Sequence, residues 1–273
     1  NKALKLKPNN KNLLRDKADT ISWLAKAEEN LGDFNAAFNM LDQAIAQLNT
    51  LLAIKPEDAS LLNLLTNTYM QQSYLLSYFP QKNSAYLKAV KATDAIEQAI
   101  TQDPENKNFI RKYYRSLAYQ LMLLENNKTS NRLEEIIGYV NQQGFSNTSI
   151  INIQLSLVHY FINRKYFEEA KELLAKLENS SDFKEKINDI SKAENYLNFV
   201  KINIIKAKLA SNKLEKLAAC NKIINTSNER NHNSKSINKI YPLIQAYSCL
   251  NKASKLDTLK DKLIDLGISD FTL

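Results

Sequence analysis

NNKNLLRDKADTISWLAKAEENLGDFNAAFNMLDQAIAQLNTLLAIK, residues 9–55, is the first copy of a unit that recurs along the chain. A proline borders it on each side, and Pro8, Pro56 and Pro104 are spaced 48 residues apart within the polar signals KPNN, KPED and DPEN. Self-similarity at a fixed period of this size is typical of stacked supersecondary units, none of which can bury its apolar face alone. The period therefore predicts a repeat architecture.

Apolar residues within the unit recur at spacings of three and four, the pattern of an amphipathic helix. One helix is predicted from Asn12 to Leu31 and a second from Phe34 to Ile54, with the pair Gly32-Asp33 between them. The four glycines and five prolines of the chain are too few for an all-β protein with many tight turns. We therefore predict an all-α fold, an α-solenoid of antiparallel helix hairpins.

The segment WLAKAEENLGDFNAAFNMLDQAI, residues 23–45, resembles a tetratricopeptide repeat (TPR), with a Gly-Asp turn, an aromatic residue and then a small residue where paired helices cross. The fragments ALKLKPNN and AITQDPEN are similar to that family's repeat ending. The resemblance implies a TPR-like superhelix whose first helices line a concave surface. It also implies that Ala37 and Ala85 lie buried at the helix crossings.

Two features depart from the TPR pattern. The period is 48 residues instead of the 34 of that family, and seven extra residues in each helix of the pair account for the difference as two additional turns. The family's first-helix aromatic and glycine are replaced by Ile21 and Ala25, and one repeat later by Tyr69 and Ser73. The first repeats are therefore expected to have extended helices.

The predicted organisation has four parts. Residues 1–8 are expected to end a truncated preceding repeat, and residues 9–145 to form extended TPR-like repeats with units that start near residues 9, 57 and 105. Residues 146–180 contain LSLVHYFINRKYFEEAKELLAKL, which resembles a family-length TPR hairpin. Residues 181–273 are expected to form C-terminal helical hairpins, the first helix of which runs from Phe183 to Ala210.

The best candidate for a binding site is a polar stripe on the first helix of each pair. Spacings of three and four place its members on one helix face, which is expected to lie opposite the core. The residues of this predicted partner-binding groove are Arg15, Asp19, Ser22, Lys26, Asn63, Asn67, Tyr74, Arg111 and Arg115. Arginine forks suit a partner protein or peptide that bears carboxylates, whereas the alternative interpretation is an ordinary solvated helix face. Trp23 is either a binding hot spot or a packing residue against the preceding repeat.

The sequence offers no set of residues suited to catalysis. His159 lies in a predicted helix and His232 in a polar loop, and neither has a cysteine or carboxylate at metal-ligand spacing. The glycines are scattered, so no phosphate-binding loop is predicted. Adjacent glutamates such as Glu168 and Glu169 point about 100° apart on a helix and cannot share a substrate. We predict no enzyme, no cofactor and no metal.

Two cysteines, Cys220 and Cys249, lie on neighbouring predicted helices. If these helices turn near residues 230–231, Cys220 lies opposite Pro242 and well short of Cys249. This register favours two small buried apolar residues over a disulfide, although a disulfide stays open as the alternative.

Charge and hydropathy set limits on partners and compartment. The net charge is +8, but the 37 basic residues are interleaved with 29 acidic ones, which favours a mixed-charge solvated surface and disfavours nucleic acid as the partner. No apolar run reaches the length of a membrane span. The leading hypothesis is a protein- or peptide-binding scaffold or sensor module of a larger bacterial signalling or regulatory protein, cytoplasmic or periplasmic. RNA binding through the basic surface is the alternative.

Overall fold

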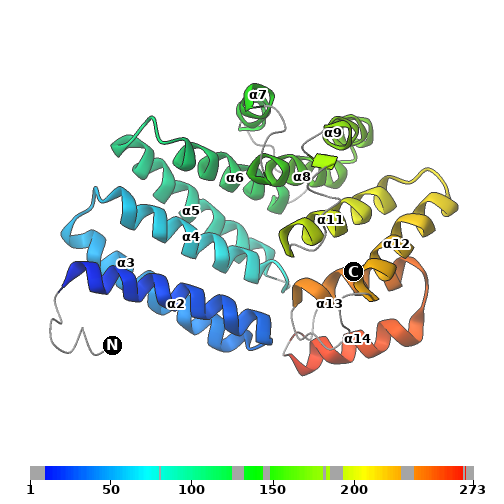
Figure 1. Cartoon of the computed structure of the whole chain (residues 1–273), viewed down its shortest axis with the longest axis horizontal. Coiled ribbons are helices and arrows are strands. Elements are labelled where there is room, and N and C mark those ends of the chain that lie inside the picture. Colours follow the sequence, from blue (N-terminus) through cyan, green and yellow to red (C-terminus); the bar gives the residue numbers. More distant parts are fainter. Residues whose placement is uncertain are drawn as a thin grey trace. The chain divides into compact units, whose positions relative to one another are not determined.

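The computed structural model describes residues 10–79, 81–124, 132–143, 148–180, 183–184, 193–228, 237–266 and 268. Within these ranges every regular element is helical (Figure 1). The helices are α2 (Lys11–Leu31), α3 (Phe34–Ile54), α4 (Ala59–Leu76), α5 (Lys82–Gln102), α6 (Lys107–Leu123), α7 (Leu133–Gln143), α8 (Thr148–Asn163), α9 (Phe167–Asn179), α11 (Ala193–Leu209), α12 (Lys213–Asn228), α13 (Ile237–Cys249) and α14 (Ala253–Asp265).

Consecutive helices pack against each other as pairs, so the prediction of an all-α solenoid is confirmed. The chain divides into two compact units at Gln120, inside α6. In unit 1, which ends at that residue, α2 pairs with α3 and α4 pairs with α5, and α4 also packs on α3. The finer division into repeat units remains a prediction. Residues 1–8, expected to end a preceding repeat, lie outside the described residues.

The proline signals of the 48-residue period begin helices as well as end them. Asn10, Asp58 and Asn106, each two residues after a proline, cap the N-termini of α2, α4 and α6. The side-chain oxygen of Asp58 accepts the backbone N–H groups of Ser60 at 3.1 Å and Leu61 at 3.2 Å. Such a bond satisfies donors that a helix leaves unpaired in its first turn. One short signal therefore stops one helix and starts the next.

The Gly-Asp pair separates α2 from α3 in the predicted way. Gly32 adopts a left-handed conformation with φ of 86°, which costs glycine nothing but strains residues that carry a Cβ. Asp33 then caps α3, because its carboxylate accepts the Ala36 N–H at 2.9 Å. The helices α2 and α3 can therefore turn back on each other over two residues.

Small residues let the paired helices of unit 1 approach closely. Ala37 and Ala85 are both completely buried, which confirms the burial that the TPR resemblance implied. Ala25 and Ser73, which replace the family's glycine, are also completely buried, and the Ser73 hydroxyl donates to the Ala85 carbonyl at 2.6 Å. A hydroxyl placed where the backbones come together thus pairs with a backbone acceptor, so its burial carries no unpaired polar group.

Unit 2, from Leu121 onward, contains the pairs α8–α9, α11–α12 and α13–α14. One apolar cluster joins α8, α9 and α11 around the completely buried Val158, Leu177 and Ile205. A second joins α11, α12 and α13 around Val200, Ile223 and Ala246. Of the long helix predicted from Phe183 to Ala210, the structure describes α11, whereas residues 185–192 lie outside the described part.

The preference for unpaired cysteines is wrong. Cys220 of α12 and Cys249 of α13 form a disulfide, with their Cα atoms 6.4 Å apart. The sequence argument assumed a turn at residues 230–231, but α12 ends at Asn228 and α13 starts at Ile237. The longer separation moves the residue opposite Cys220 toward the C-terminal end of α13, within reach of Cys249.

Candidate functional site

The polar stripe of α2, α4 and α6, made of the nine residues predicted above, lies within unit 1. Eight of the nine are half-buried, and Asn67 is exposed. Most of the stripe is therefore only partly open to solvent, because stacking of the first helices brings part of it against the next hairpin. One contact shows this directly: the hydroxyls of Ser22 on α2 and Thr68 on α4 are 3.0 Å apart.

Lys112 of α6 lies beside the stripe and contacts two of its members on α4. Its ammonium group donates to the side-chain oxygens of Asn63 at 2.5 Å and Asn67 at 2.9 Å. Burial, and then the nearby charge of Arg115, lower the pKa of Lys112 to about 8. This residue was missed by the sequence analysis, because it lies one position from the Arg111–Arg115 row on the same helix.

Arg115 contacts Tyr74 across the same pair of helices. Its Nε donates to the Tyr74 hydroxyl at 3.3 Å, and its guanidinium carbon lies 5.8 Å from the centre of that ring. The ring of the buried Tyr119 meets Tyr74 edge-on at 4.3 Å between centroids. Burial, and then the neighbouring Tyr74, raise the pKa of Tyr119 well above its ordinary value. The arginine is thus held in place by an aromatic pair.

On α2, local ion pairs hold two of the predicted cations. Lys26 donates to Glu29 at 2.6 Å, and the carboxylate of Glu29 is almost fully buried. Arg15 pairs with Asp16 at 2.9 Å. The predicted stripe is therefore less cationic on α2 than its sequence indicates, because each charge has an acidic neighbour.

The α6 end of the stripe is different. This helix carries Lys107, Arg111, Lys112 and Arg115 and contains no acidic residue. Arg111 bonds to the side chain of Asn108 and to the carbonyl of Lys107, so its position is set within its own helix. The structure therefore concentrates the positive charge of the stripe on α6, next to the amides of α4.

His159 on α8 has no catalytic character. Burial lowers its pKa to about 3, and the charges of Lys208 and Lys201 on α11 act in the same direction. A histidine that stays neutral down to this pH is neither a proton shuttle nor a switch near neutrality. His232 lies outside the described residues.

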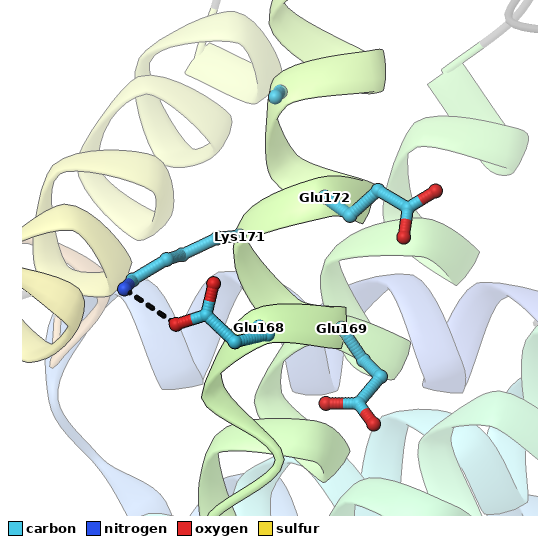
Figure 2. A pocket seen from close by; sticks show the side chains of 5 residues that line it. Glu168, Glu169, Lys171 and Glu172 are labelled. Carbon is cyan, nitrogen blue, oxygen red and sulfur yellow. Dashed lines mark hydrogen bonds and ion pairs between the residues drawn. The ribbon is translucent and has the colours of Figure 1, made fainter.

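Figure 2 shows a second polar surface, on α9 of unit 2. Glu168 accepts from Lys171 at 2.8 Å on one side of the helix, and Glu169 and Glu172 lie on the other side (Figure 2). The hollow they line, with Ala175, has a volume of about 570 Å³, and all its residues belong to one helix. The view fits the prediction that adjacent glutamates point apart, and the surface is a solvated helix face.

A concave surface also lies between α9, α11 and α12 of unit 2, with a volume of about 440 Å³. Leu174 and Leu209 contribute apolar surface, and Lys206 pairs with Glu178 at 2.5 Å across the α9–α11 contact. Glu215 accepts from the hydroxyl of Ser211 at 3.1 Å. Lys206, Glu178 and Glu215 of this surface are thus used in contacts between or within the helices that form it.

Within the described residues, no cluster of histidine, cysteine and carboxylate side chains has a geometry that could hold a metal ion. None of the described helices combines the length and apolar character needed to span a bilayer.

Comparison with known proteins gives one family. The family model described as "Plant specific mitochondrial import receptor subunit TOM20" matches residues 9–154, more than half of the chain. No curated protein and no solved structure gives a significant match. The matched range begins at the first residue of the 48-residue unit and includes α2 to α7.

This match corrects three expectations. The hypothesis of a bacterial signalling or regulatory module is wrong, because the matching family is a plant mitochondrial import receptor. The cytoplasmic or periplasmic bacterial location is wrong for the same reason. The alternative of RNA binding has no support from a family of protein receptors.

The prediction of TPR-like helix hairpins stands, and the matching family is that of an import receptor. Helix hairpins with small residues at their crossings lie within the matched range. The chain belongs to the family of the plant-specific mitochondrial import receptor subunit TOM20.

Proposed function

We propose that the protein is a non-catalytic receptor for polypeptides that are imported into mitochondria. We also propose that the polar stripe of α2, α4 and α6 is a binding surface for these polypeptides. The family description supports the receptor role. The choice of this surface rests on the cations of α6, among which Lys112 is held by two side-chain amides of α4. No cofactor is needed, because binding alone is the function.

The positive charge of this surface determines which kind of polypeptide segment it can bind. Lys112, Arg111 and Arg115 carry positive charge without an acidic residue on their own helix. A planar guanidinium donates two hydrogen bonds to one carboxylate, so the surface suits a segment with acidic side chains or a terminal carboxylate. Mitochondrial targeting segments are rich in arginine and poor in acidic residues, and like charges repel them here. The stripe therefore binds another part of the polypeptide.

Charge reversal of Arg111 and Arg115 tests the proposal. The double variant Arg111→Glu/Arg115→Glu should lose most of its binding to a labelled mitochondrial precursor protein, because attraction becomes repulsion. The melting temperature should fall somewhat, because Arg115→Glu also removes the contact with Tyr74, so circular dichroism must show that the double variant is folded before its binding is compared. The matched control reverses Lys82 and Lys91, two exposed lysines on α5, and should bind as the wild type does.

Two probes locate the interacting segment. The precursor without its Arg-rich targeting segment should still bind the wild type, and the isolated targeting peptide should bind the double variant no more weakly than the wild type, because the reversal removes the repulsion between like charges. The proposal fails if the double variant retains wild-type affinity for the precursor, or if the α5 control loses as much.

A further inference from the structure

One face of α2 exposes apolar side chains that no other described helix covers. Trp23 is 71% exposed, Leu31 63% and Leu24 49%, and Ala27 between them is also exposed. Residues three and four apart lie on one side of a helix, so these four form one stripe, which we name the α2 end face. A helix at the free end of a solenoid needs a polar outer face, whereas an exposed apolar patch indicates an interaction site.

The 48-residue repeat shows what the equivalent face of α4 contacts. The four positions correspond there to Gln71, Gln72, Leu75 and Phe79. The Gln71 amide donates to the carbonyl of Ser22 on α2 at 3.3 Å. The Gln72 amide donates to Asp42 on α3 at 2.7 Å. Two neighbouring side chains of this face therefore reach both helices of the preceding hairpin.

The other two positions on α4 are apolar. The Phe79 ring, at the position of Leu31, lies 5.7 Å from the ring of Phe34 and 5.8 Å from that of Phe38, both near the start of α3. Leu75, one turn earlier on α4, is 1% exposed. The face thus forms part of the interface between the α4–α5 hairpin and the hairpin before it.

The next repeat repeats these contacts. On α6, the ring of Tyr119 meets Tyr74 of α4 edge-on at 4.3 Å between centroids. The amide of Gln120 donates to the carbonyl of Ala89 on α5 at 3.3 Å. Again one side chain reaches the first helix of the preceding hairpin, and the next side chain reaches the second helix.

A hydroxyl recurs beside this face in all three repeats. The hydroxyl of Thr68 on α4 lies 3.0 Å from that of Ser22 on α2, and the hydroxyl of Thr93 on α5 donates to that of Ser116 on α6 at 2.8 Å. The counterpart on α2 is Thr20, which is exposed and donates to a carbonyl of its own helix at 2.7 Å. The α2 helix thus keeps the residue type with which α4 and α6 bond to the hairpin before them.

We propose that the α2 end face is the interface for a helix hairpin of this same repeat type, which precedes Pro8 in the polypeptide. Pro56 and Pro104 follow the second helices α3 and α5, and Pro8 has the same place in the 48-residue period. The counterpart of α3 accordingly comes before Pro8. Residues 34–42 of α3 make the contacts with α4, so their counterparts lie upstream of Asn1.

The face also indicates the chemistry of the occupant. Gln72 meets the carboxylate of Asp42, whereas Leu24 at the same position on α2 requires an apolar partner. The counterpart of Asp42 on α5 is Val90, which is apolar. The α4–α5 hairpin is therefore a suitable probe for the α2 end face. It contains no tryptophan, so the fluorescence of Trp23, the only tryptophan of the chain, reports on the contact.

A chimera tests whether the face accepts such a hairpin. A copy of residues 57–104 replaces residues 1–8, which keeps the 48-residue phase and sets Val90 of the copy against Leu24. The emission of Trp23 should shift to the blue, and its quenching constant with acrylamide should fall several-fold relative to the chain without the copy. Circular dichroism should show the added helices.

A pair of substitutions tests the register. Val90→Asp in the copied hairpin places a carboxylate against Leu24 and should restore most of the quenching, because the carboxylate loses water without gaining a partner. Adding Leu24→Gln should shield Trp23 again, because it recreates the pair that Gln72 and Asp42 form between α4 and α3. A chimera whose Trp23 is as open as in the chain without the copy, or a double variant without rescue, overturns the proposal.

The natural polypeptide supplies the second arm. When it is translated from the start codon of its own gene, Trp23 should be shielded without any added hairpin. A natural polypeptide whose Trp23 is quenched as strongly as in the chain that starts at Asn1 overturns the proposal, even if the chimera is shielded. The α2 end face and the polar stripe share no residue, so either result leaves the proposed receptor function to its own tests.

Discussion

At Lys112 two opposing effects act on one ammonium group. The amides of Asn63 and Asn67 stabilise its charge through hydrogen bonds, whereas burial and the nearby Arg115 disfavour it. Burial wins, because the pKa falls to about 8 from an ordinary 10.5. The residue that anchors α6 to α4 is therefore partly neutral just above physiological pH.

The titration of Lys112 predicts a pH effect on stability. Between about pH 8 and 10 the unfolded chain keeps the proton on this lysine and the folded chain releases it. The folded state thus binds fewer protons, and the free energy of unfolding rises with pH across this window. Lys112→Met should remove that part of the rise in urea titrations at several pH values. Parallel pH profiles for variant and wild type would show that the folded state does not lower this pKa.

Gln154 on α8 is a second residue with an energetic cost. It is completely buried among isoleucines and leucines, and among the described residues neither its amide nitrogen nor its amide oxygen has a hydrogen-bond partner. A buried polar group without a partner costs about 1–3 kcal/mol. Gln154→Met, which keeps the length of the side chain, should therefore raise the free energy of unfolding by about 1–3 kcal/mol in urea. Loss of stability would instead mean that the amide has a partner.

Residues with a local role were the most predictable from the sequence. Gly32 and Ala37 were placed correctly, because turn geometry and close packing leave few alternatives to glycine and alanine. Lys112 and Gln154 were missed, because their importance depends on contacts from other helices, which the pattern of one helix does not contain. The pairing of Arg15 with Asp16 and of Lys26 with Glu29 was missed although each pair lies within α2, because a spacing pattern does not fix which rotamers the side chains adopt.

Among the elements, α12 and α13 are joined covalently. The Cys220–Cys249 disulfide closes a loop across a sequence separation of 29 residues, which restricts the unfolded chain. By the loop-entropy relation, this separation corresponds to about 3–4 kcal/mol of stability. Cys220→Ala/Cys249→Ala should lower the opening free energy of α12 and α13 in hydrogen exchange by that amount.

A reductant supplies the control for the disulfide. It should weaken wild-type protection in α12 and α13 to the level of the double variant and leave the variant unchanged. Equal protection in the reduced and oxidised wild type would contradict a stabilising role.

Helix boundaries show where sequence reasoning works at this scale. The limits of α3 were predicted to the residue, because a capping aspartate precedes the helix and a Lys-Pro pair follows it. The register between α12 and α13 was not, since it depends on the length of a connection that carries no turn signal. The register between two helices decides which side chains meet, so the sequence pattern could not predict the disulfide.

For the molecule as a whole, the 48-residue period determines the fold, and the family match supports the proposed function. A 48-residue repeat of amphipathic helices dictates stacked hairpins, because each hairpin buries its exposed face only against a neighbour. The same stacking explains why most of the polar stripe is half-buried. No feature of the period indicates a compartment, which is why the bacterial assignment was wrong.

Site-specific photo-crosslinking tests the central claim, that polypeptides bind along the polar stripe of α2, α4 and α6. A photoreactive residue in place of Asn67, the exposed member of the stripe on α4, should crosslink to a bound mitochondrial precursor protein. The same residue in place of Gln98, which is exposed on α5, should give no product with the precursor. Equal crosslinking from both positions, or crosslinking from Gln98 alone, would contradict the account.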